Sequence, residues 1–144
     1  MLKDPSPHVR TYAVAALGGI HPVASESLRA LLDRLRPSNE EQSDVRKEVA
    51  YQLSFMESLG KVVVPELVRA LNDDPDAWVR RGAMNALGTL GPASQSAIPV
   101  LRALVEDPSP IRVLRKSDNA APERRYVDAE REEVRAALAK IEGH

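Results

Sequence analysis

The histidines of this chain are the first residues to consider for chemistry. His8, His21 and His144 lie in a helix start, a turn and the last position, with no spacing that would bring them to one metal ion. Cysteine is absent, which excludes disulfides, thiolate metal sites and cysteine nucleophiles. The sequence predicts no metal site and no cofactor.

Two pairs of adjacent carboxylates, Glu40-Glu41 and Glu132-Glu133, are the next candidates. Adjacent residues of a helix point about 100° apart, so we expect both pairs to lie on the solvated surface rather than to share a proton. No nucleophile has a base beside it, and no glycine-rich loop could hold a phosphate. We therefore expect no catalytic residues.

Composition limits the class of protein. The 144 residues are 43% apolar and 28% charged, which is enough for one domain with a buried core, here expected to span residues 1–144. The 20 basic and 21 acidic residues nearly cancel, so no overall field attracts nucleic acid or an anionic membrane. No apolar run approaches the roughly 18 residues of a membrane span, and the start MLKDPSPHVR lacks a signal-peptide core. A cytoplasmic protein without a membrane partner is the expectation.

Internal repetition decides the fold class. Three segments, residues 4–20, 43–56 and 74–90, each contain Val-Arg followed by a leucine eight residues after the valine. Shorter apolar segments with helical spacing lie between them. Asp-Pro opens two of these segments, at Asp4-Pro5 and Asp74-Pro75, and occurs again at Asp107-Pro108, and we expect each aspartate to cap a helix. The unit is therefore helix, tight turn, helix, and the chain is expected to be all-α, with seven helices and no strand.

With these residues the sequence resembles the HEAT-repeat superfamily, in particular the short bacterial and archaeal type of phycobilisome lyase subunits. The shared pattern is Asp-Pro, Val-Arg, paired alanines and Ala-Leu-Gly, and it covers most of residues 2–112. The resemblance implies a right-handed α-solenoid of about three and a half helix pairs, with the Val-Arg helices along the concave face. It also implies that Arg10, Arg46 and Arg80 form a structural ladder near the turns. An arginine row that binds phosphate is the alternative.

The repeat also predicts which residues are buried. We expect the recurring leucines, together with Ala13, Ala16 and Ile20 of the first unit, to face the core. The recurring leucines are Leu17, Leu53, Leu87 and Leu138.

Aromatic residues follow a different stripe. On a helical wheel that starts at the repeated valine, the four aromatics of these segments fall between about 240° and 300°, outside the core positions. In the geometry that the resemblance implies, this stripe faces the concave groove, and aromatics beside arginine suit a binding surface. The alternative is that some of them pack between neighbouring repeats. The predicted partner-binding residues are Tyr12, Lys47, Tyr51, Phe55, Trp78, Arg81 and Asn85.

The fourth unit departs from the pattern. Its leucine, Leu138, lies 51 residues after Leu87, so about seventeen residues are inserted. We place a loop at about residues 115–130, after which Leu138 and Ile141 restore the frame, with Arg131 rather than Arg135 in the arginine position.

The first unit departs as well, because residues 2–4 read as the tail of an outer helix. Solenoid ends need polar caps, so we expect a longer repeat array, an oligomer or partner that covers this end, or a short folded-over helix.

Two classes of function remain open. The favoured one is a non-catalytic scaffold that binds a peptide or partner protein on the concave face. The alternative, which the fold alone suggests, is a HEAT-like subunit of an enzyme that handles nucleic acid or a bilin, as in a lyase.

Overall fold

A computed structural model shows an all-α chain, as predicted, and describes residues 1–106 and 124–143. No strand occurs in these ranges. The predicted insertion at 115–130 lies mostly outside the described residues. The helices are α1 (Pro7–Gly18), α2 (Ser25–Arg34), α3 (Ser43–Leu53), α4 (Gly60–Asp73), α5 (Ala77–Leu90), α6 (Ile98–Glu106) and α7 (Arg124–Glu142), with short 3-10 turns η1 (Glu57–Leu59) and η2 (Gly91–Ala97).

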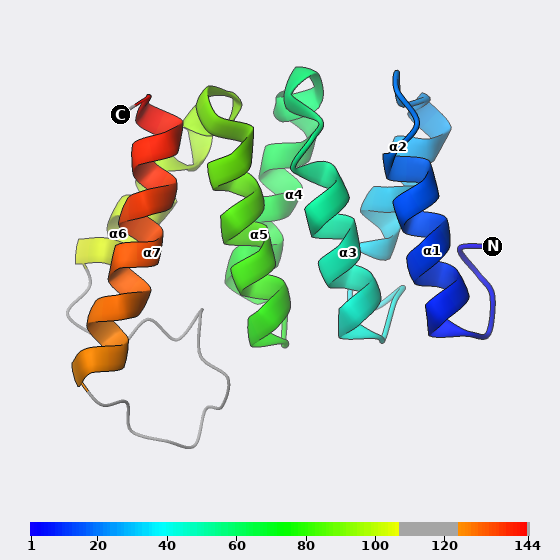
Figure 1. The fold of residues 1–144 in the computed structure, drawn as a ribbon, viewed down its shortest axis with the longest axis horizontal. Helices are drawn as coiled ribbons and strands as arrows, with labels where there is room; N and C mark the ends of the chain where they lie inside the picture. The colour runs from blue at the N-terminus through cyan, green and yellow to red at the C-terminus, as the bar shows by residue number, and fades with distance from the viewer. Residues whose placement is uncertain (107–123, 144) are drawn as a thin grey trace.

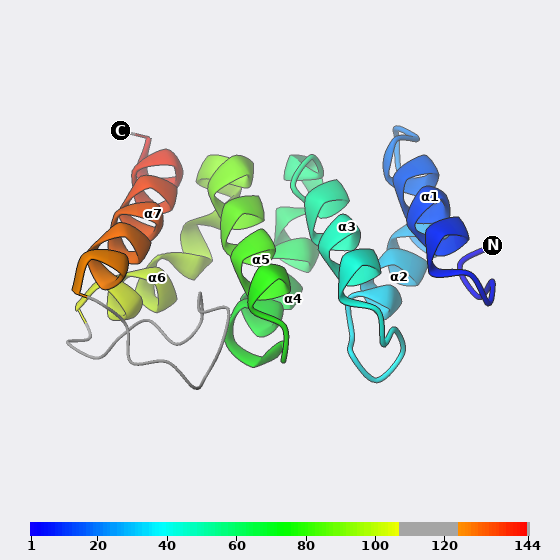
Figure 2. The same ribbon diagram turned by 60° about the horizontal axis from the view of Figure 1, so that its bottom comes forward.

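The helices form two layers of an α-solenoid (Figure 1). One layer holds α1, α3, α5 and α7 side by side in chain order, and each packs against the next. The other layer holds α2, α4 and α6 behind it, as the turned view also shows (Figure 2). Within this arrangement α4 packs along α5, and α6 packs along α7. We call the exposed side of the first layer the groove face.

Small residues let the helices of the first layer approach closely. A Cβ added at Gly18 would lie 2.5 Å from Cβ of Gln52 in α3, and one at Gly88 would lie 3.2 Å from Cβ of Ala137 in α7. Gly91 ends α5 with a φ of 55°, a conformation that favours glycine. The glycines of the repeat thus serve helix packing as well as helix termination.

Burial confirms the repeat frame in the inner units and corrects it at the first. Leu53 and Leu87 are fully buried and Leu138 is buried, as predicted. Leu17 is instead only partly buried, and Ile20 is 60% exposed. Ala16 is likewise exposed, although Ala13 is buried. The physical reason is position: α1 ends the row, and no helix among residues 1–106 and 124–143 covers it as α4 covers α5.

The expected aspartate caps are also displaced. Asp76, rather than Asp74, caps α5, because its carboxylate accepts hydrogen bonds from the amides of Trp78 and Val79. Asp74 instead accepts a hydrogen bond from the amide of Asp76 at 2.9 Å. Asp4 does the same for Ser6 at 2.9 Å, so these residues shape the turn before the helix.

The arginines of the repeat lie between successive turns. Arg46 forms a bidentate pair with the carboxylate of Asp74 at 2.8 and 2.9 Å, and it donates to the carbonyls of Glu40 and Glu41. Both charged side chains are almost fully buried. Arg80 donates to the carbonyls of Asp74 and Pro75 in the same way. Arg46 thus joins the turn before α3 to the turn before α5, and these hydrogen bonds of Arg80 hold the turn before its own helix.

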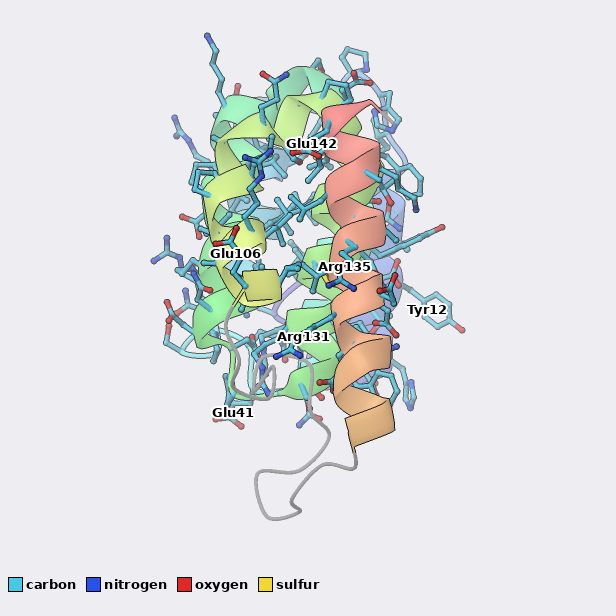
Figure 3. The ribbon with its side chains drawn as sticks, turned by 90° about the vertical axis from the view of Figure 1, so that its left-hand side faces the viewer. Tyr12, Glu41, Glu106, Arg131, Arg135 and Glu142 are labelled. Carbon is cyan, nitrogen blue, oxygen red and sulfur yellow. The ribbon has the colours of Figure 1, made fainter. Side chains whose placement is uncertain are left out.

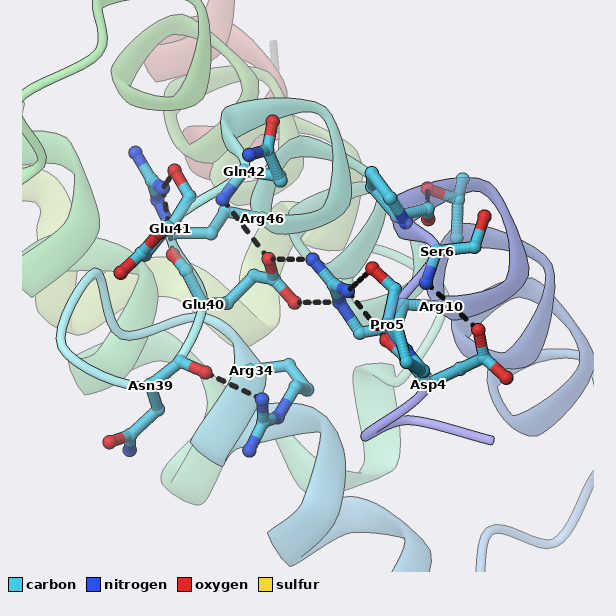
Figure 4. A network of polar contacts seen from close by, with 12 residues as sticks. Asp4, Pro5, Ser6, Arg10, Arg34, Asn39, Glu40, Glu41, Gln42 and Arg46 are labelled. Atoms are coloured by element: carbon cyan, nitrogen blue, oxygen red, sulfur yellow. Dashed lines mark hydrogen bonds and ion pairs between the residues drawn. The ribbon is translucent and has the colours of Figure 1, made fainter.

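Glu40 takes the place of the aspartate in the turn before α3 (Figure 4). Its carboxylate accepts two hydrogen bonds from Arg10, at 2.7 and 2.9 Å, and one from the amide of Gln42. Burial alone would raise the pKa of Glu40, but the hydrogen bonds from Arg10 and Gln42 outweigh it, so the pKa lies below its usual range. The same hydrogen bond to Glu40 raises the pKa of Arg10.

This pairing corrects the prediction for one acidic pair, because Glu40 is 2% exposed rather than solvated. Glu41 is exposed, as expected. The sequence hides the difference because only the fold places Arg10 opposite Glu40.

Candidate functional site

The groove face has a pocket of about 720 Å³ between α3 and α5. One face of α5, from Trp78 to Thr89, forms one wall. Residues of α3 from Lys47 onward, with Ser54 and Phe55 directly after the helix, form the other. Six of the seven residues predicted to bind a partner line this pocket. They are Lys47, Tyr51, Phe55, Trp78, Arg81 and Asn85.

Trp78 lies in the first turn of α5, where its backbone amide donates a hydrogen bond to the carboxylate of the cap residue Asp76 at 2.8 Å. Its side chain is 47% exposed, which is high for a large apolar residue. The guanidinium carbon of Arg81 lies 5.8 Å from the centre of the indole ring, within the range of a cation–π contact. Arg81 also forms an ion pair with Glu133 of α7. The ring therefore has a cationic neighbour that is itself held by α7, while about half of the residue stays exposed.

Tyr51 and Phe55 form the opposite aromatic wall. Their ring centres are 5.0 Å apart and the planes meet at 88°, an edge-to-face pair one helical turn apart. Both remain at least half exposed, at 57% and 50%. A pair that is ordered but not buried presents apolar area to a ligand at little further cost in side-chain entropy.

The charges around the pocket are mixed. Lys47 pairs with Asp44 at 2.9 Å, and Glu48 accepts a hydrogen bond from the amide of Gln52. With Arg81 paired to Glu133, each basic group of the wall has an acidic neighbour. Such a surface suits a polypeptide with apolar and mixed polar side chains better than a polyanion.

The groove continues from this pocket toward α7. A smaller hollow of about 180 Å³ lies between α5 and α7 and shares Asn85 and Thr89 with the larger one. Glu133 and Lys140 line its far side. The two hollows together cross three helices, which is the shape of a site for an extended segment.

Tyr12 lies apart from the other predicted residues. It is 75% exposed and projects from the first layer (Figure 3), but it lines a different hollow at the free side of α1. Tyr12 shares the helical-wheel stripe of the other aromatics. It belongs to α1, however, which lies on the far side of α3 from α5, so it does not reach the pocket between α3 and α5.

Some residues of the site were not predicted. Gly82 and Ala86 also line the pocket, and a Cβ at Gly82 would lie 3.6 Å from Cγ of Lys47. The sequence held a signal for this part of the pocket. Gly82 lies three residues after the repeated valine, where the other two units have the larger Tyr12 and Glu48. Glu133 was expected to be solvated, and its pairing with Arg81 arises because α7 packs against α5.

The histidines, the remaining candidates for chemistry, do not line the pocket between α3 and α5. His8 and His21 are exposed, and His144 is outside the described residues. In the part of the chain that the structure describes, no group of three or more His, Cys, Asp or Glu residues could hold a metal ion. Nor does any helix there have the length and apolar character to cross a membrane.

Comparison with known proteins agrees with the geometry. The sequence model of the family described as HEAT repeats matches residues 39–117, more than half of the chain. The chain belongs to the HEAT-repeat family. Comparison with curated proteins and with solved structures gave no match. HEAT repeats are commonly protein-interaction scaffolds, and that coarser statement carries over with the family.

Proposed function

We propose that this HEAT-repeat chain is a non-catalytic interaction module that binds a polypeptide segment across the groove face, from α3 to α7. Trp78, Tyr51 and Phe55 supply apolar anchors, and the polar groups of Lys47, Arg81 and Asn85 orient the bound backbone and side chains. The observation that carries the proposal is the pocket between α3 and α5, whose walls hold three aromatic residues that are each about half exposed.

The repeat itself supports this interpretation. The position of Trp78 is occupied by Asp44 in the neighbouring unit, and the position of Phe55 by Thr89. The fold therefore does not need a large side chain at either position. Aromatic residues that the fold does not need, beside an arginine, are typical of hot spots in protein interfaces. A peptide would bury the exposed parts of Trp78 and of the Tyr51–Phe55 pair.

A peptide-display selection tests the proposal. The native chain serves as bait, and the Trp78→Ala chain serves as counter-bait to remove sequences that bind elsewhere. We expect selected peptides to carry an aromatic or large aliphatic residue. We also expect their affinity to fall only weakly between 50 and 200 mM salt, in contrast to the loss of about a thousandfold or more that many phosphate contacts would give.

The same salt series can contradict the proposal. A selection that yields no peptide dependent on Trp78, together with single-stranded or duplex DNA binding that is steeply salt-dependent, would assign the groove to nucleic acid instead.

A further inference from the structure

The character of the groove face changes along the row of first-layer helices. In the units of α3, α5 and α7, the residue two positions after the repeat leucine lines the pocket or the smaller hollow. Equivalent positions of stacked repeats lie at the same height in a solenoid. From α3 to α7 this position is first aromatic, then neutral and polar, then cationic. The three residues are Phe55, Thr89 and Lys140, which follow Leu53, Leu87 and Leu138.

The position two residues before each repeat leucine shows a similar order. It is Tyr51 in α3, Asn85 in α5 and Ala136 in α7. Tyr51 belongs to the aromatic wall, whereas the side-chain amide of Asn85 makes no hydrogen bond within the described part of the chain. Ala136 lines the smaller hollow together with Lys140. Aromatic area is thus concentrated over α3, and polar groups lie over α5 and α7.

Lys140 presents a positive charge to the smaller hollow. Its Cδ lies 3.8 Å from the place that a Cβ on Gly88 would occupy, so its aliphatic stem packs against α5 on the groove face. The residue is nevertheless exposed. No carboxylate among residues 1–106 and 124–143 pairs with its ammonium group. The stem is therefore positioned by α5, while the charge is available to a ligand.

The carboxylates of α7 that lie near this hollow are engaged elsewhere. Glu133 lines the same hollow, but it pairs with Arg81. It also lies two helical turns before Lys140, about 10 Å along the helix axis. Two further carboxylates of α7 are likewise paired, Glu132 with Arg135 and Glu142 with Arg102.

The α3 side of the groove has an excess of the opposite sign. Asp44 pairs with Lys47 at 2.9 Å, so these two charges balance each other. Glu48 also lines the pocket, and its carboxylate accepts a hydrogen bond from the uncharged amide of Gln52. No cation in the described part of the chain forms an ion pair with Glu48. An acidic group of a ligand is therefore disfavoured over α3 and favoured over α7.

We propose that the polypeptide segment bound across the groove carries an aspartate or glutamate whose carboxylate pairs with Lys140, beside an apolar residue seated among the aromatics of the pocket. The proposal rests on the proposed function of the groove and adds the charge of the partner. Asn85 and Thr89 line both hollows, so they offer polar groups to the backbone that joins the two residues. The exposed pair adds little affinity, but a like charge at the same place is repelled, which gives specificity.

Helix packing sets the spacing between the apolar residue and the acidic one. The pocket and the smaller hollow lie on either side of α5, which has α3 and α7 as its neighbours in the row (Figure 1). Their centres are therefore about one helix-to-helix distance apart, roughly 8–10 Å. An extended chain advances about 3.3 Å per residue. The acidic residue is expected about two to four residues from the apolar anchor, on one side of it only.

The test begins with a peptide that binds the native chain and depends on Trp78. Both peptide ends are blocked and its acidic residues are changed to glutamine. A series then places one glutamate at each position up to about five residues on either side of the anchor, and affinity is measured by fluorescence anisotropy. We expect glutamate to bind about threefold or more tighter than glutamine within the predicted spacing, on one side of the anchor and not on the other.

Variants of the chain assign this preference to Lys140. In the Lys140→Gln chain the glutamate and glutamine peptides should bind equally. In the Lys140→Glu chain the preference should reverse, and a lysine at that peptide position should restore binding. The control is Lys61→Glu, which makes the same change in net charge at an exposed residue of α4 that lines neither hollow, and it should leave the preference unchanged.

Equal affinity of the glutamate and glutamine peptides at every position would overturn the proposal. So would a glutamate preference that persists in the Lys140→Glu chain. In either case, binding that still depends on Trp78 leaves the proposed function of the groove standing. A selection that yields no Trp78-dependent peptide removes both.

Discussion

Two adjacent arginines of α5 belong to different regions of the molecule. Arg80 points to the turns, is 9% exposed and donates to the carbonyls of Asp74 and Pro75. Arg81 points to the groove face, contacts the ring of Trp78 and pairs with Glu133. The turn region is buried and closed, whereas the groove region is ordered and open.

The turn region is built from residues that recur in each repeat, whereas the groove region is built from residues that do not. Arg80 recurs as Arg10 and Arg46, and the turn contacts recur with it, which is what a repeated structural requirement produces. Trp78, Tyr51 and Phe55 do not recur at equivalent positions of the inner units. In a repeat protein, the residues that break the pattern without loss of packing are the ones to examine for function.

The largest effect is expected in the turn region. Arg46→Ala leaves the carboxylate of Asp74 buried without its bidentate partner, and removal of one member of a buried pair costs about 3 to 5 kcal/mol. Urea unfolding followed by circular dichroism measures the loss. Lys47→Ala, next in sequence but half-exposed on the groove face, is the matched control and should cost less than about 0.5 kcal/mol.

The next comparison contrasts equivalent leucines. Leu53→Ala creates a cavity at a fully buried position and should cost about 2 to 5 kcal/mol. Leu17→Ala, at the partly covered end, should cost less than half as much, because part of that side chain is already in water. Equal losses at the two positions would mean that α1 is covered as fully as α3.

Acid should weaken the turn region selectively. Because the pKa of Glu40 is lowered in the folded chain, its contribution to stability is present above the ordinary glutamate value of about 4.3 and is lost as the pH falls through the folded value. We expect Glu40→Gln to be less stable at neutral pH and to lose less stability than the native chain between pH 5 and pH 3. Parallel pH profiles for the two chains, from urea midpoints, would argue against the Arg10 pairing.

The helices and most of the groove residues could be predicted from the sequence because they depend on local pattern. The Val-Arg and leucine spacing predicts the helices and the buried Leu53 and Leu87, and the wheel separates Trp78 from the core. The exposure of Ile20 was not readable, because burial in a solenoid is set by the neighbouring repeat rather than by the residue itself. The pairing of Glu133 with Arg81 was not readable either, since it depends on the packing of α7 against α5, and the two residues lie 52 positions apart in the sequence.

The smallest effect on stability is expected in the groove region. Trp78→Ala removes a half-exposed side chain and should change the unfolding free energy by less than about 1 kcal/mol. As the chain's one tryptophan, Trp78 should emit at long wavelength and be readily quenched by acrylamide. Blue-shifted, unquenched emission with a strongly destabilised variant would place the ring in the core.

The most direct test of the groove is an affinity ratio. A peptide selected on the native chain is titrated by calorimetry against the native, Trp78→Ala and Val62→Ala chains, the last removing an exposed apolar side chain from the other layer. We predict that Trp78→Ala weakens binding about thirtyfold or more, a hot-spot loss of about 2 kcal/mol, while Val62→Ala stays within twofold of the native chain. Binding by the Trp78→Ala chain within twofold of the native chain would contradict the proposal that the groove pocket binds polypeptides.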